Sequence, residues 1–135
     1  TGEATVLVCH LLLAALCAAM PLSAQHKMRI LSETVLRQLE EDETFAAMIA
    51  LNTQMLLEQD EAHASGETTY QTELYGCTAK IIEQGQKEGT MAAGPGMKLA
   101  DYYWGVVYLY SLKRLFTTQY EMITPEDLDR TVLKG

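Results

Sequence analysis

Few residues of this chain have the types and spacing that catalysis or metal binding requires. The three histidines, His10, His26 and His63, are scattered, and no two have the spacing of metal ligands on one helix. Asp60 and Glu61 lie beside His63, but a solvated helix end explains this group better than a metal site does. The chain contains no HExxH, CxxC, GxSxG, P-loop or GxGxxG motif. We therefore expect no enzyme activity, no bound metal and no cofactor.

The cysteines and the net charge indicate the compartment and the partners. The chain has only three cysteines, Cys9, Cys17 and Cys77. A small and odd number of cysteines does not make a disulfide framework, which favours a reducing, cytoplasmic setting. The formal charge is −8, from 18 acidic and 10 basic residues. Such a chain repels phosphate, so by itself it is not expected to bind DNA. The stretch between Arg37 and Lys80 has nine carboxylates and no Lys or Arg, which indicates either a solvated surface or a field that attracts small cations.

Methionine and aromatic side chains indicate a possible ligand pocket. The chain has seven Met, seven Tyr and one Trp, mostly within residues 43–119. Such stripes usually form ordinary core, but Met also gives a soft cavity lining, to which Tyr, Trp and Asn add orienting polar groups. We expect an apolar or cationic-amphipathic effector to contact Met48, Asn52, Met55, Tyr70, Leu74, Tyr103 and Trp104.

Helical periodicity determines which elements position these side chains. A chain of 135 residues is typical of one domain. Helices are expected over about 4–20, from Ser23 to the acidic junction at 40–43, and over about 43–62, 67–87 and 97–119. A last helix begins at Thr124-Pro125, with Thr124 as its N-cap. Gly85 and Gly89 are expected to close the helix that precedes the 89–97 loop. No segment alternates with period two, so the fold class is all-α with about six helices.

The helix over 97–119 is apolar on two sides. One stripe contains Leu99, Tyr103, Val106 and Tyr110, and the other contains Trp104, Tyr108, Leu112 and Leu115. A helix that is apolar all round must be buried all round, as a central helix or at a subunit interface. We expect a two-fold homodimer whose interface contains Tyr108, Leu112, Leu115, Phe116 and Leu128.

The apolar stretch over residues 6–20 leaves two interpretations open. As a helix it would reach about 22 Å, which is short of the ~30 Å hydrocarbon core, so no membrane span is expected. A signal segment over residues 1–24 would make the chain a secreted or export-associated helical interaction domain. The flank before it carries Glu3 and no Lys or Arg, and Leu22 is too large for the usual cleavage pattern, so a buried helix is favoured.

Residues 81–110 carry a resemblance to a known family. One predicted helix ends in a sequence motif with Gly85, Gln86 and Gly89. After a short turn, the next predicted helix starts with Leu99-Ala100 and continues to Tyr103-Trp104. Residues 26–57 add a pair of helices joined by an acidic junction. Over roughly 22–133 the chain resembles the C-terminal effector-binding and dimerisation domain of TetR-family transcriptional regulators. One departure is Gly105, which follows Trp104 directly, whereas the family glycine usually lies a few residues further on.

The resemblance implies a fold, a division of the chain and a function. It implies an antiparallel helical bundle that dimerises through its last two helices. Residues 1–21 would be a connector helix leading from a DNA-binding helix-turn-helix that has no counterpart here, and residues 22–135 the effector-binding and dimerisation domain. The resemblance implies effector sensing in a cytoplasmic repressor, whose DNA binding would depend on the missing N-terminal domain.

Overall fold

The all-α fold class is confirmed. The computed structural model describes residues 21–58 and 70–135, with side chains described from residue 74 onward in the second range. These residues form the helices α2 (Ala24–Glu41), α3 (Glu43–Glu58), α4 (Tyr70–Glu88), α5 (Gly96–Phe116) and α6 (Pro125–Asp129). Within the two described ranges the only β-type pairing is one antiparallel bridge between Met91 and Leu133. The helix expected over about 4–20 lies outside the described residues.

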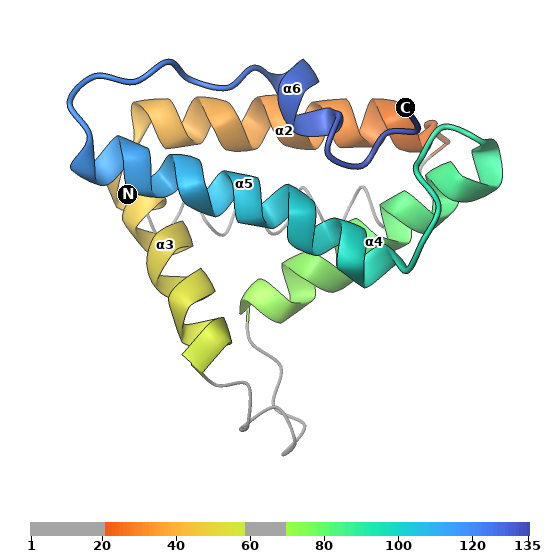
Figure 1. The fold of residues 1–135 in the computed structure, drawn as a ribbon, viewed down its shortest axis with the longest axis horizontal. Helices are drawn as coiled ribbons and strands as arrows, with labels where there is room; N and C mark the ends of the chain where they lie inside the picture. The colour runs from red at the N-terminus through yellow and green to blue at the C-terminus, as the bar shows by residue number, and fades with distance from the viewer. Residues whose placement is uncertain (1–20, 59–69) are drawn as a thin grey trace.

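The other helices pack against two long helices, α2 and α5. α2 and α5 extend along the long axis of the molecule, while α3 and α4 form a V whose tip points away from them (Figure 1). α5 packs mainly against α4 and α3, and α2 contacts α6, α4 and α3. The short α6 lies against α2, and the segment between α5 and α6 crosses the top of the molecule (Figure 1). α5 is therefore the helix that most of the fold is built around. No helix in the described ranges has the length and apolar character needed to cross a membrane.

Helix starts are where the sequence and the structure agree best. The Ser23 hydroxyl accepts a hydrogen bond from the His26 N–H at 3.1 Å and so caps α2. The Thr124 hydroxyl accepts from the Asp127 N–H at 3.1 Å, with Pro125 at the first helical position of α6. Both side chains satisfy a backbone donor that has no partner within its own helix. Both predicted N-caps are confirmed.

The end of α4 differs from the sequence expectation. Gly85 lies inside the helix, and α4 ends only at Glu88, before Gly89 with φ +84°. Gly85 serves packing instead: a Cβ there would lie 2.0 Å from Met91 Cγ and 3.1 Å from the Ala24 Cβ. The prediction that Gly85 helps to close the helix is therefore wrong, because its missing side chain makes room for Met91.

The core is continuous through all five described helices. The largest side chains that are at most 2% exposed come from all five helices: Met28, Leu31, Leu39, Phe45, Ile49, Ile81, Ile82, Tyr103, Trp104 and Leu128. On α3 the buried face includes Ala46, Ala50 and Thr53, whereas Met55, one of the predicted effector contacts, is 42% exposed. Small residues on this side let α3 approach α5 closely.

Candidate functional site

Three of the predicted effector contacts lie in the hydrophobic core. Leu74, Tyr103 and Trp104 are at most 2% exposed. Trp104 Nε1 donates a hydrogen bond to Thr78 Oγ1 at 2.9 Å, and its ring meets that of Tyr103 edge to face at a centroid distance of 5.3 Å. The polar atoms of these aromatic side chains thus already have protein partners. Tyr103 and Trp104 connect α5 to α2 and α4.

The other predicted effector contacts lie at the edge of the core or outside it. Met48 and Asn52 are half-buried on α3, and Met55 is exposed. Tyr70 begins α4, and its side chain is not among those described. The hollows at the end of α5, at the α4–α5 loop and beside α2 are lined by other residues. The structure therefore brings Leu74, Tyr103 and Trp104 together but not the full predicted set.

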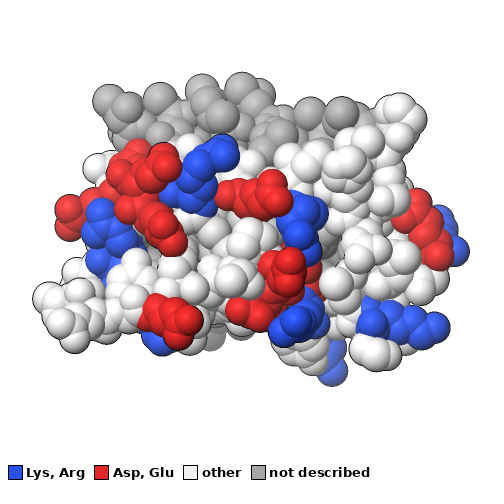
Figure 2. All heavy atoms as spheres, turned by 90° about the horizontal axis from the view of Figure 1, so that it is seen from above, with Lys and Arg blue, Asp and Glu red and all other residues white. Residues whose placement is uncertain are grey.

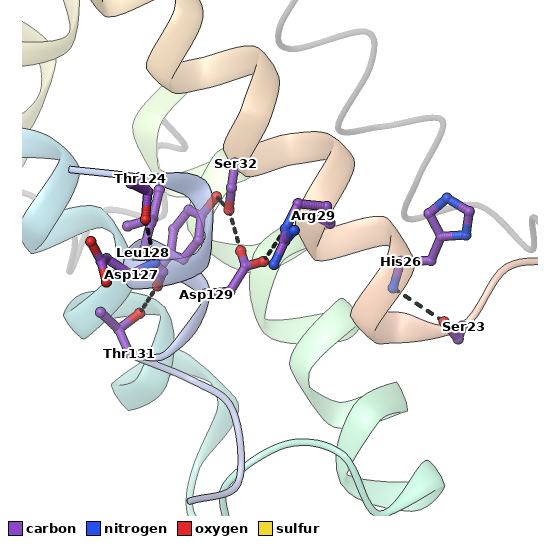
Figure 3. A network of polar contacts seen from close by, with 10 residues as sticks. Ser23, His26, Arg29, Ser32, Thr124, Asp127, Leu128, Asp129 and Thr131 are labelled. Atoms are coloured by element: carbon purple, nitrogen blue, oxygen red, sulfur yellow. Dashed lines mark hydrogen bonds and ion pairs between the residues drawn. The ribbon is translucent and has the colours of Figure 1, made fainter. Parts of the chain in front are cut away.

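A buried polar network joins α6 to α2 and α5 (Figure 3). The Asp129 carboxylate is 1% exposed and accepts hydrogen bonds from Arg29 Nε at 2.8 Å and Ser32 Oγ at 2.5 Å. The Tyr103 hydroxyl lies 2.8 Å from Ser32 Oγ. Because the one Ser32 proton is used toward Asp129, the Tyr103 hydroxyl must be the donor to Ser32. The result is a directed chain from Tyr103 through Ser32 to Asp129, closed by Arg29.

Burial and the shared carboxylate change the acid–base properties of this network. Burial raises the pKa of Tyr103 well above its ordinary value, so its hydroxyl keeps its proton. The hydrogen bond that Arg29 donates to the Asp129 carboxylate raises the pKa of Arg29. Asp129 and Tyr103 are sealed from solvent, so the network holds α6 in place and offers no open site for a substrate. Sequence reasoning missed it; the available signal was Ser32, a polar residue within the apolar stripe of α2.

The predicted dimer residues fall into three groups. Phe116 is 80% exposed, and Tyr108, Leu112 and Leu115 are half-buried. Leu128 is fully buried within its own chain, so its side chain does not lie on a surface that a second copy can touch. This corrects the prediction for Leu128: the single apolar side of the short α6 faces α2 and α5. The predicted interface residues therefore do not all lie on the surface, because Leu128 is buried.

A different face of α5 is apolar and open to solvent. The buried side carries Leu99, Ala100, Tyr103, Trp104, Val107 and Ser111. The opposite side, which we call the outer face of α5, carries Tyr102, Gly105, Leu109 and Phe116, with Lys98 and Lys113 on the same side of the helix. Tyr102 and Leu109 are each 48% exposed. Their spacing of seven residues, repeated at Phe116, is two helical turns and places all three on one line. Of the two predicted stripes, only Leu99, Tyr103 and Trp104 lie on the buried side, and the other members are half-buried.

Gly105 leaves space at the centre of the outer face. A Cβ built there would meet no heavy atom within 4 Å. Gly105 lies one turn from both Tyr102 and Leu109, so the helix backbone is accessible between two large side chains. A glycine in a helix interior lowers helix stability by about 1 kcal/mol relative to alanine. Among the residues that the structure describes, no contact explains why a glycine stands at that position.

Both signs of charge occur on the face of the molecule that Figure 2 shows. Acidic and basic side chains alternate on the face seen from above, with uncharged residues between them (Figure 2). Among the described residues no group of three or more His, Cys, Asp or Glu side chains could hold a metal ion. Comparison with protein-family models, with curated proteins and with solved structures found no match.

Proposed function

We propose that this chain is the effector-sensing and homodimerising domain of a TetR-like transcriptional regulator. The observation that carries the proposal is the outer face of α5, an apolar stripe opposite the side of the same helix that enters the core. In this proposal DNA binding belongs to a helix-turn-helix outside the 135 residues, and the protein acts in the cytoplasm. Support comes from the resemblance over residues 22–133 and from the packing of α5 at the centre of the fold.

The energy of the outer face favours a second copy as its cover. Full burial of one large apolar side chain contributes about 1.5–3 kcal/mol. The exposed parts of Tyr102, Leu109 and Phe116 amount to nearly two such side chains, or about 3–5 kcal/mol per chain. A two-fold partner buries the same face twice, so the gain doubles to about 6–10 kcal/mol, which exceeds the cost of association where that cost lies in the lower part of its ~4–15 kcal/mol range. Half-buried Val106 and Leu112 at the edges of the face add to it.

The position of α5 also supports signal transfer. Tyr103 and Trp104 lie in the core, while Tyr102 and Gly105, their neighbours in sequence, lie on the outer face. An effector that displaces the core side chains would therefore turn or shift the helix that meets the partner. Small helix shifts at subunit interfaces are a common route for such switching.

The outer face is tested by one charge substitution and a matched control. Leu109→Asp places a carboxylate at the centre of the proposed interface, where it meets its own copy. Leu51→Asp makes the same change on α3, where Leu51 is 53% exposed. Loss of about 1 kcal/mol of burial in each chain weakens the dimer about 30-fold, before charge repulsion is added. We expect a monomer for Leu109→Asp and a dimer for Leu51→Asp in sedimentation equilibrium. The reverse pattern would place the interface on α3.

A further inference from the structure

An open groove lies where α5 ends. Its volume is about 640 Å³, within the range of ~300–1,000 Å³ typical of small-molecule sites. One wall is α5, through Tyr110 and Lys113, and another is the start of α6. Residues 117–124 are called the strap here, and all of them except Thr118 line the rest of the groove. Met122 and Ile123 of the strap are half-buried and pack on the core, so the floor of the groove is apolar.

The groove has two fixed walls and one adjustable wall. The α6 side is held by the Asp129 network and by the Thr124 cap, and the α5 side is part of the central helix. Residues 118–123 of the strap make no hydrogen bond to any other described residue. A segment without such bonds rearranges at low free-energy cost, which allows the strap to adapt to a bound molecule.

The groove also contains one cation and one acid that lack charged partners. Lys113 Nζ lies 4.9 Å from the centre of the Tyr110 ring and forms no ion pair within the described part of the chain. Glu121 on the strap likewise forms none there. The other carboxylate in the groove, Asp127, is paired with Arg130 at 3.1 Å. A bound molecule therefore meets one positive and one negative group beside aromatic side chains.

We propose that this groove binds a small aromatic zwitterion, such as an aromatic amino acid. Its carboxylate pairs with Lys113 and its ammonium group with Glu121. Its ring lies between Tyr110 and Tyr120 over the apolar floor, where aromatic rings gain from packing beyond their buried area. The chain's charge of −8 opposes a ligand of net negative charge but does not oppose a neutral zwitterion. That this ligand is the effector rests on the proposed function; that the groove binds it does not.

Three compounds that share one aromatic body test the inference on the full chain. L-Phenylalanine carries both charges, 3-phenylpropanoate only the negative one and 2-phenylethylamine only the positive one. We expect L-phenylalanine to shift the amide NMR signals of the strap and to bind about fivefold more tightly than either other compound, since each exposed ion pair contributes up to ~1 kcal/mol. Absence of shifts up to about 20 mM, or equal binding of all three compounds, would overturn the inference.

Charge-neutralising variants test which groups are used. Lys113→Gln should weaken L-phenylalanine and 3-phenylpropanoate binding about fivefold, and Glu121→Gln should do the same for L-phenylalanine and 2-phenylethylamine. Lys98→Gln, an exposed change at the other end of α5, is the matched control and should leave binding unchanged. An equal effect of Lys98→Gln would show only a long-range field and would overturn the site. Sedimentation of the same samples reports the dimer separately, so a failed groove with an intact dimer leaves the proposed function standing.

Discussion

Substitution of Gly105 should have opposite effects on the single chain and on the dimer. In a single chain, Gly105→Ala adds a methyl group in open space and removes the helix penalty of glycine, a gain of about 1 kcal/mol. For a domain of this size that raises the melting temperature by about 3–4 °C. Gly105→Leu keeps most of this gain, because leucine is also a strong helix former. In the proposed dimer, however, the leucine side chain would occupy the space into which the second helix is expected to pack.

The two effects can be measured separately. Folding stability is measured by urea denaturation in the Leu109→Asp background, where the chain is expected to be monomeric. Dimer affinity is measured by sedimentation equilibrium without that substitution, where we expect Gly105→Leu to weaken the dimer at least about tenfold, or ~1.4 kcal/mol. Gly76→Ala on α4 is the matched control, since a Cβ there also meets nothing within 4 Å. It should raise stability without changing the dimer. A dimer unaffected by Gly105→Leu would refute the placement of the interface on the outer face of α5.

Three further predictions concern the core and the surface. Thr78→Val leaves the buried Trp104 N–H without its acceptor and should lower the free energy of unfolding by about 1–3 kcal/mol in urea denaturation; an unchanged value would mean that this hydrogen bond contributes nothing. Gly85→Ala forces a methyl group against Met91 and should destabilise by about 1–3 kcal/mol, whereas equal or higher stability would show that this contact relaxes freely. Hydrogen bonds donated by the Gln84 side-chain amide and by the Ala24 backbone N–H hold the pKa of Glu88 below its ordinary value. Its stabilising effect is therefore present above the unfolded-state pKa and lost as the pH falls through the lower folded-state pKa, and an NMR titration midpoint at or above the ordinary value would contradict this.

Local rules predicted the helix boundaries because their causes are local. The caps at Ser23 and Thr124 depend on one side chain and the next turn, so the residue type at one position settles them. The acidic junction was also correct, since α2 ends and α3 begins around Asp42. The prediction for Gly85 was wrong because the cause of that glycine is not local. Its role depends on Met91 from the next loop, a contact that no pattern within α4 contains.

The site residues were harder to predict because tertiary packing determines them. On α5 almost every side is apolar, so periodicity could not say which side the other helices cover. The structure buries the side with Tyr103 and Trp104 and leaves Tyr102 and Leu109 exposed. The groove at the end of α5 depends on where the strap crosses the surface. Neither its volume nor the place of Lys113 in it follows from the spacing of residues along the chain.

Sedimentation equilibrium of the unaltered chain tests the central claim most directly. The outer face of α5, with Phe116 80% exposed at its end, predicts a monomer–dimer equilibrium with dimer predominant at tens of micromolar, which corresponds to a net free energy of association of about −6 kcal/mol. A two-fold dimer of this kind should dissociate in the Leu109→Asp variant. A single monomeric species persisting at about 50 μM would contradict the dimer and, with it, the proposed function.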